Sequence, residues 1–121
     1  MENAVNVDSA GNTLVIGPDA WTEKAGPGVN AAVTATHPAT AGVRHRVAQV
    51  AWSFTAAPAA ATIQVKDGAT VLVELDVVAA GPGQLAFDPP LASTRGNAVS
   101  AVLGAGGAGV GGRVALVGTS D

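Results

Sequence analysis

The sequence has no cysteine and no tyrosine among its 121 residues, and it has only two histidines. Without cysteine there is no disulfide framework, no thiolate nucleophile and no cysteine-based zinc site. With two histidines and no tyrosine, a general acid–base site has few possible members. We therefore expect a protein that is not an enzyme, with no catalytic residue, no metal site and no cofactor.

Aromatic residues are also scarce, at 3%, and charged residues make up 12%, about half the usual share. Hydrophobic residues reach 48%, but they are mostly alanine and valine. A methyl group buries much less area than a leucine or phenylalanine side chain, so the apolar gain per residue is small. We expect a thin core and a chain that gains stability by associating with other chains.

The formal net charge is −3, which gives no bulk attraction to nucleic acid or to an anionic membrane. No apolar run approaches the ~20 residues that span a bilayer. The first six residues have neither the basic nor the apolar segment of a secretory signal. We expect a soluble protein, made in a cytosol, whose partners include no nucleic acid and no membrane.

The chain is organised around residues 43–78, which are typical of two strands followed by a tight turn and a third strand. Asp67-Gly68 lies between alternating apolar runs, which is a strong hairpin signal. Glycine and proline separate eight runs of four or more residues that indicate strands. These runs are 13–16, 29–36, 43–55, 62–66, 70–78, 84–88, 98–103 and 113–117. The spacing predicts an all-β fold, an antiparallel β-sandwich that is jelly-roll-like with about eight strands.

Residues 1–28 are rich in Asn, Asp, Gly and Pro, and we interpret them as an N-terminal arm with a short strand before a sandwich domain at 29–121. In the run 43–55 the apolar alternation changes parity near Ala48-Gln49, which predicts a β-bulge. Trp52 and Phe54 follow, and we expect them to form the centre of the core. Pro89-Pro90 is expected to end the strand at 84–88.

Two polar or aromatic features are candidates for contacts. Trp21 lies in the arm, where a lid over one end of the core is favoured over an interface anchor. Arg44-His45-Arg46 is the one basic cluster. The favoured interpretation is that these charges lie on an edge strand and act as a guard against its pairing with other chains. The alternative is that they bind an acidic patch on a partner or a phosphate.

The glycine run 104–109 matches G-x-G-x-x-G, the fingerprint of a dinucleotide site. That mechanism needs a helix after the glycines, and the residues that follow indicate a strand instead. A hairpin loop, or glycines that let another backbone approach closely, is the favoured interpretation. Glu74 and Asp76 share one strand face, and a solvated pair is favoured over half of a calcium site.

Several segments together resemble small virion proteins of tailed bacteriophages. They are 46–58, 63–68, 81–83, 87–91 and 105–111, within a similarity that covers roughly 43–118. The chain resembles the β-sandwich proteins that decorate or cement phage heads, and related modules at the base of head or tail fibres. The resemblance implies a non-enzymatic structural role in the virion. The implied partners are the major capsid protein or another virion protein, and other copies of the chain, as a homotrimer first or a dimer second.

Under this resemblance the N-terminal arm and the glycine loop are expected to contact neighbours. The interface candidates are Trp21, Arg44, His45, Arg46, Gly106, Gly107 and Gly109. A decoration protein is the first hypothesis. A fibre or tail module, acting as a β-sandwich adhesin or a fibre anchor, is the second, and a small cytosolic ligand-binding sandwich is the third.

Overall fold

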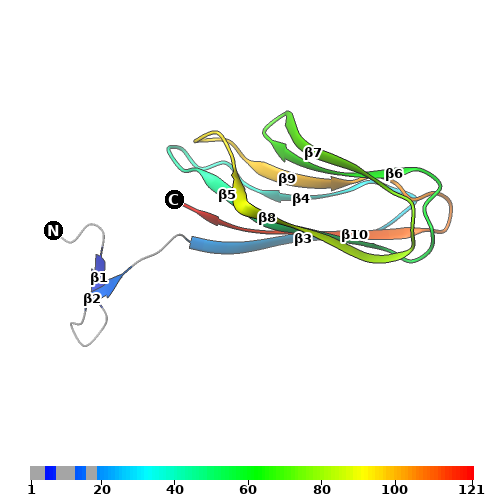
Figure 1. The fold of residues 1–121 in the computed structure, drawn as a ribbon, viewed down its shortest axis with the longest axis horizontal. Helices are drawn as coiled ribbons and strands as arrows, with labels where there is room; N and C mark the ends of the chain where they lie inside the picture. The colour runs from blue at the N-terminus through cyan, green and yellow to red at the C-terminus, as the bar shows by residue number, and fades with distance from the viewer. Residues whose placement is uncertain (1–4, 8–12, 16–18) are drawn as a thin grey trace.

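The computed structural model describes residues 5–7, 13–15 and 19–121, and these residues form ten strands and no helix. β1 (Val5–Val7) pairs with β2 (Thr13–Val15) in an antiparallel hairpin. The other eight strands form two four-stranded sheets that pack face to face (Figure 1). Within the described ranges, no helix has the length and apolarity needed to cross a membrane.

Sheet I has the strand order β3-β10-β5-β8, and sheet II has the order β4-β9-β6-β7. The strands of sheet I are β3 (Asp19–Val29), β10 (Gly111–Ser120), β5 (His45–Phe54) and β8 (Gly81–Ala92). Those of sheet II are β4 (Val33–His37), β9 (Val99–Leu103), β6 (Ala61–Asp67) and β7 (Thr70–Val77). Every pair is antiparallel, and β3 pairs with β10, β4 with β9, β5 with β8, and β6 with β7. This nested pairing is that of a long hairpin rolled into a jelly roll, so the predicted fold class is confirmed.

The core lies between the sheets and consists mainly of aliphatic side chains from alternate strand positions. Its largest fully buried apolar side chains are Ile63, Leu103, Leu116, Val47, Val50, Val65 and Val99. Phe54 is also buried, as expected. Trp52 is only half-buried, because its indole lies over Gly83 of the edge strand β8, where an added Cβ would come within 2.6 Å of Trp52 Cε2. The expectation that Trp52 forms the centre of the core is therefore wrong.

Two local predictions in the middle of the chain are confirmed. The pairing of β5 with β8 shifts register between Val47 and Gln49, where the bulge was expected. The turn between β6 and β7 is formed by Gly68 and Ala69, and Gly68 has a φ of +57°, a conformation that glycine adopts without strain.

Three boundaries differ from the sequence-based expectation. The sandwich begins at Asp19, inside the expected arm, because β3 pairs with β10 along the edge of sheet I. The expected strand 29–36 is split by a turn at Asn30, whose φ is +49°. Pro89 and Pro90 lie within β8 and do not end it, because β8 is an edge strand and its pairing with β5 is interrupted between Ala86 and Leu91.

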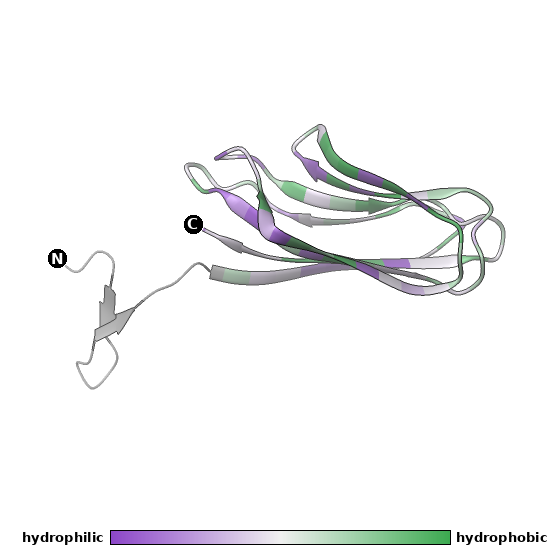
Figure 2. Cartoon of the chain, in the orientation of Figure 1, coloured by the Kyte–Doolittle hydropathy of each residue, from purple (hydrophilic) through white to green (hydrophobic). Residues whose placement is uncertain are grey.

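The edge strand β7 leaves apolar side chains uncovered. Leu75 pairs with the buried Ile63 and has the inward parity, yet it is 43% exposed, as is Val71. Leu72 points outward and is 38% exposed, and Val78, just after the strand, is 75% exposed. Figure 2 shows β7 as a largely hydrophobic ribbon at the rim of sheet II. The sandwich is therefore not closed at this edge by its own side chains.

Shortening two leucines compares the filled centre with this open edge. We expect Leu103→Ala to lower the free energy of unfolding by about 3 kcal/mol, because Leu103 is fully buried. Leu75→Ala should lower it by less than about 1 kcal/mol in the isolated chain, because much of its side chain already contacts water. Urea unfolding measures the free energy of unfolding of both variants. Equal decreases for the two variants would contradict the conclusion that the β7 edge is open.

Candidate functional site

The two histidines, which belong to different strands, come together at one end of the sandwich. His37 ends β4 and His45 begins β5, and their ring centroids are 4.5 Å apart in an edge-on arrangement. Trp21 of β3 stacks on His37, with centroids 4.1 Å apart and an interplanar angle of 5°. Trp21 also packs against the core, so it forms a lid over this end of the sandwich.

A chain of hydrogen bonds runs through the buried His45. Trp21 Nε1 donates to Ser120 Oγ at 2.9 Å, and Ser120 Oγ lies 2.6 Å from His45 Nδ1. His45 Nε2 lies 2.9 Å from the Pro38 carbonyl oxygen. A carbonyl oxygen only accepts and an indole N–H only donates, so the matching tautomer carries its proton on Nε2 and accepts from the serine hydroxyl at Nδ1. The indole nitrogen, the serine hydroxyl and both imidazole nitrogens of this hydrogen-bond chain then all have partners.

A hydrogen-bonded contact between a glutamate and a histidine completes the cluster at the junction of the two sheets. Glu23 Oε2 of β3 lies 2.8 Å from His37 Nδ1 of β4. Both side chains are partly exposed, and the stacked Trp21 ring lies beside the pair. The contact joins sheet I to sheet II where the chain passes from one sheet to the other.

The serine, histidine and glutamate of this cluster are not arranged for nucleophilic catalysis. His45 is 1% exposed, and both of its ring nitrogens already have partners inside the protein. A substrate atom cannot reach a general base that is covered in this way. We assign the cluster a structural role, as a polar clasp between the sheets.

The basic cluster Arg44-His45-Arg46 does not form one surface. His45 is buried and so offers no side-chain surface to a partner, contrary to its place among the interface candidates. Arg46 is partly exposed and lies 3.4 Å from a carboxylate oxygen of Asp121. The favoured role as an edge-strand guard is wrong, because β5 lies between β10 and β8 inside sheet I.

The glycine loop is divided between packing and exposure. Gly106 is buried, and an added Cβ would lie 2.9 Å from Phe54 Cε1, so it serves close packing and presents no side-chain position to a partner. Gly107 and Gly109 have φ values of +108° and +74°, and Gly109 is exposed. The strand β10 follows at Gly111, so the helix that a dinucleotide site requires is not present after these glycines.

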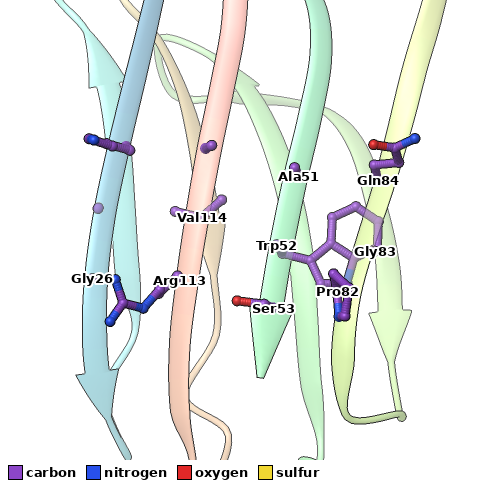
Figure 3. A pocket seen from close by; sticks show the side chains of 12 residues that line it. Gly26, Ala51, Trp52, Ser53, Pro82, Gly83, Gln84, Arg113 and Val114 are labelled. Atoms are coloured by element: carbon purple, nitrogen blue, oxygen red, sulfur yellow. The ribbon is translucent and has the colours of Figure 1, made fainter. Parts of the chain in front are cut away.

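The outward face of sheet I carries a hollow of about 720 Å³ (Figure 3). Its lining residues are Lys24, Ala25, Gly26, Ala51, Trp52, Ser53, Pro82, Gly83, Gln84, Arg113, Val114 and Ala115. Strand register orders them in rows across the sheet. Ala115 pairs with Lys24 on one side and with Ala51 on the other, and Ala51 pairs with Gln84. Two residues along β10, Arg113 pairs with Ser53.

The hollow exists because the two central strands carry small side chains at their outward positions. Ala51, Ser53 and Ala115 form the floor, and the longer Lys24 and Gln84 rise on either side. Lys24 and Arg113 are exposed cations, and no acidic residue is among the lining residues. The size lies within the usual range of ligand sites, and the charge favours an anionic group.

Sequence reasoning did not identify this hollow. Lys24 fell within the supposed arm and Arg113 within the last strand, and only the pairing of β3 with β10 brings them to one face. The available signal was the run of small residues at one parity of two inner strands. Such a run of small residues indicates a hollow only when the order of the strands in the sheet is known.

Asp67 fastens the β6–β7 turn to the loop before β9. Its carboxylate accepts hydrogen bonds from the Thr94 backbone N–H at 2.9 Å, the Thr94 hydroxyl at 2.8 Å and Asn97 Nδ2 at 3.0 Å. Partial burial alone raises the pKa of Asp67, but the hydrogen bonds from Thr94 and Asn97 outweigh it and hold the pKa below its usual value. The charged form is thus the form that the fold stabilises.

We expect Ser120→Ala to lower the free energy of unfolding by about 2 kcal/mol, because it leaves both the Trp21 indole N–H and His45 Nδ1 without their partner. Ser100→Ala, on the outward face of β9, should change it by no more than about 0.5 kcal/mol. Urea unfolding followed by tryptophan fluorescence measures both. Equal effects would contradict the clasp.

Asp67 should make stability depend on pH in the acid range. Its pKa is lower in the folded state, so its stabilisation is present above the unfolded pKa of about 4 and is lost as the pH falls through the folded-state value. Asp67→Asn should therefore destabilise the protein at neutral pH and show a shrinking difference from wild type below pH 4. A difference that stays constant with pH would contradict this role.

Comparison with known proteins finds no match to a protein-family model and none to a curated protein. Among solved structures, the chain is similar to the CBM36-1 domain of a multidomain xylanase from the hindgut metagenome of Trinervitermes trinervoides. The identity is 11%, the TM-score is 0.49, and 83% of this chain and 97% of that one are covered. It is also similar to a chain of the Bacillus endospore appendages, described as disulfide-linked pili, at 13% identity and a TM-score of 0.36, with coverage of 85% and 89%. With TM-scores below 0.5, neither likeness bears on the function.

Proposed function

We propose that this chain is a non-enzymatic structural protein of a tailed-phage virion, which binds and stabilises the capsid exterior as a decoration protein. The proposal joins the sequence resemblance to one structural observation, the uncovered apolar edge at β7. Repeated copies bind the capsid lattice and one another, and they assemble on the particle in the host cytoplasm.

The β7 edge supports an assembly role because an exposed, apolar edge strand is a site where another chain can add. Val71, Leu72 and Leu75 are each between 38% and 43% exposed, and Val78 is 75% exposed. The strand has eight residues and contains no proline, so its outer backbone groups are able to pair. A partner that covers this edge supplies the apolar burial that the thin core lacks.

The other edge strands are less suited to pairing. In sheet I, β3 contains Pro27 and β8 contains Pro82, Pro89 and Pro90, each of which lacks a backbone N–H. In sheet II the opposite edge, β4, has five residues and is followed by Pro38. This contrast supports β7 as the edge that meets other subunits.

A second candidate function is a fibre or tail module that acts as an adhesin. The hollow on sheet I favours it, because a volume of about 720 Å³ is of the size that ligand sites have. Such a module is present in few copies per particle, whereas a decoration protein follows the lattice.

Copy number separates the two candidates. We expect the protein in purified virions at a number comparable to that of the major capsid protein, and we expect the isolated protein to co-sediment with assembled capsids but not with unassembled capsid protein. Quantitative mass spectrometry of virions and sedimentation measure these outcomes. A few copies per particle would favour the fibre module, and absence from virions would remove both.

A further inference from the structure

We propose that the hollow on sheet I receives the outward face of β7 from a second copy of this chain, in a head-to-tail contact. The contact uses Lys24, Ala51, Arg113 and Ala115 of the hollow, together with Val117, which lies next along β10 outside the hollow. On the other copy it uses the β7 face, formed by Leu72, Glu74 and Asp76. The inference deepens the proposed function, because it names the surfaces through which neighbouring copies meet.

The hollow is a trough whose width suits a strand. Its floor follows β10 and β5, and its sides are Lys24 on β3 and Gln84 on β8. From β3 to β8 there are three strand spacings, about 14 Å, whereas one strand takes up about 5 Å in that direction. In Figure 3, Arg113 lies on one side of the trough and Gln84 on the other, with Ala51 and Ser53 between them.

The β7 face carries the opposite charge. Glu74 and Asp76 are exposed, and with Leu72 they occupy alternate positions of one strand, about 7 Å apart, on the outward side of sheet II. Gln64 Nε2 donates to Glu74 Oε2 at 2.6 Å, which fixes the direction of that carboxylate. Along the strand, this face therefore presents one apolar side chain followed by two acidic side chains.

The trough has the complementary sequence at the same spacing. Along β10 the outward residues are Val117, Ala115 and Arg113, and Lys24 pairs with Ala115 from β3. Val117 is 37% exposed, which makes it an apolar surface for Leu72.

When Leu72 of one copy is placed on Val117 of the next, Glu74 of the first copy comes beside Lys24 of the second. In the same register, Asp76 comes beside Arg113. Both rows repeat every second residue, so one register satisfies all three positions. The alanine floor leaves room for the incoming side chains. The complementary charges fix the direction of the contact.

The β7 face of a copy cannot fill the hollow of the same copy, because the two surfaces lie on opposite sheets. The contact uses two different surfaces, and repeated contacts of this kind form a ring when the rotation closes. Because the two surfaces face opposite ways, the contact extends into an open stack of copies when the rotation does not close.

The test is sedimentation of the isolated protein in low-salt buffer, with unfolding curves to show that each variant is folded. We expect wild type to associate, and to dissociate as salt screens charges beyond the Debye length of about 10 Å at 0.1 M. Glu74→Lys with Asp76→Lys should yield monomers. So should Lys24→Glu with Arg113→Glu.

Charge reversal supplies the decisive comparison. A chain that carries all four substitutions should associate again, and an equimolar mixture of the two double variants should form mixed assemblies. Asp88→Lys is the matched control, because it changes the charge of an exposed residue on β8 outside both surfaces and should leave association unchanged.

Three results would overturn the contact. They are a wild-type monomer at every concentration, double variants that still associate, and a fourfold variant that stays monomeric. If wild type is a monomer yet binds capsids, the self-contact fails while the proposed function stands. If wild type associates through these charges but is missing from virions, the proposed function fails while the contact stands.

Discussion

The limited apolar volume between the two sheets is the constraint on which the rest of the structure depends. Alanine and valine fill most inward positions, and Phe54, Ile63, Leu103 and Leu116 are the larger buried side chains. Packed sheets keep a separation of about 10 Å, so small side chains cannot fill the whole width of the sandwich. At the β3–β4 side the gap is closed by the clasp of Trp21, His37 and His45. No comparable aromatic clasp is found at the β7–β8 side among residues 20–121, and there apolar side chains stay in contact with water.

The distribution of proline adds to this asymmetry. Both edges of sheet I contain proline within the strand, and a proline nitrogen cannot donate to an added strand. Proline therefore protects β3 and β8 from pairing with other chains, and it does so at edges where it costs no internal hydrogen bond. The β7 edge has no such protection. Among the edges of the two sheets, β7 is therefore an edge where proline does not limit the addition of another strand.

The strands and the fold class could be predicted from the sequence because alternation and turn residues are local signals. The Asp67-Gly68 turn and the parity change before Val50 are examples, since each is specified by a few neighbouring residues. What failed depends on strand order. Pro89 and Pro90 predict a strand end only while the place of β8 at an edge is unknown. His45 is an interface candidate only while its burial against the other sheet is unknown. The hollow was missed for the same reason, since Lys24 and Arg113 lie almost ninety positions apart in the chain.

Alanine has opposite effects on the two faces of sheet I. On the inward face a small side chain weakens the core, because it removes apolar area from burial. On the outward face, at Ala51 and Ala115, the same small size creates the hollow without any loss inside. A chain with larger residues at both faces would have a fuller core and a flat outer surface, and it would have less to gain from a neighbour. The alanine-rich composition therefore accounts both for the small apolar area inside the sandwich and for the hollow on its outer face.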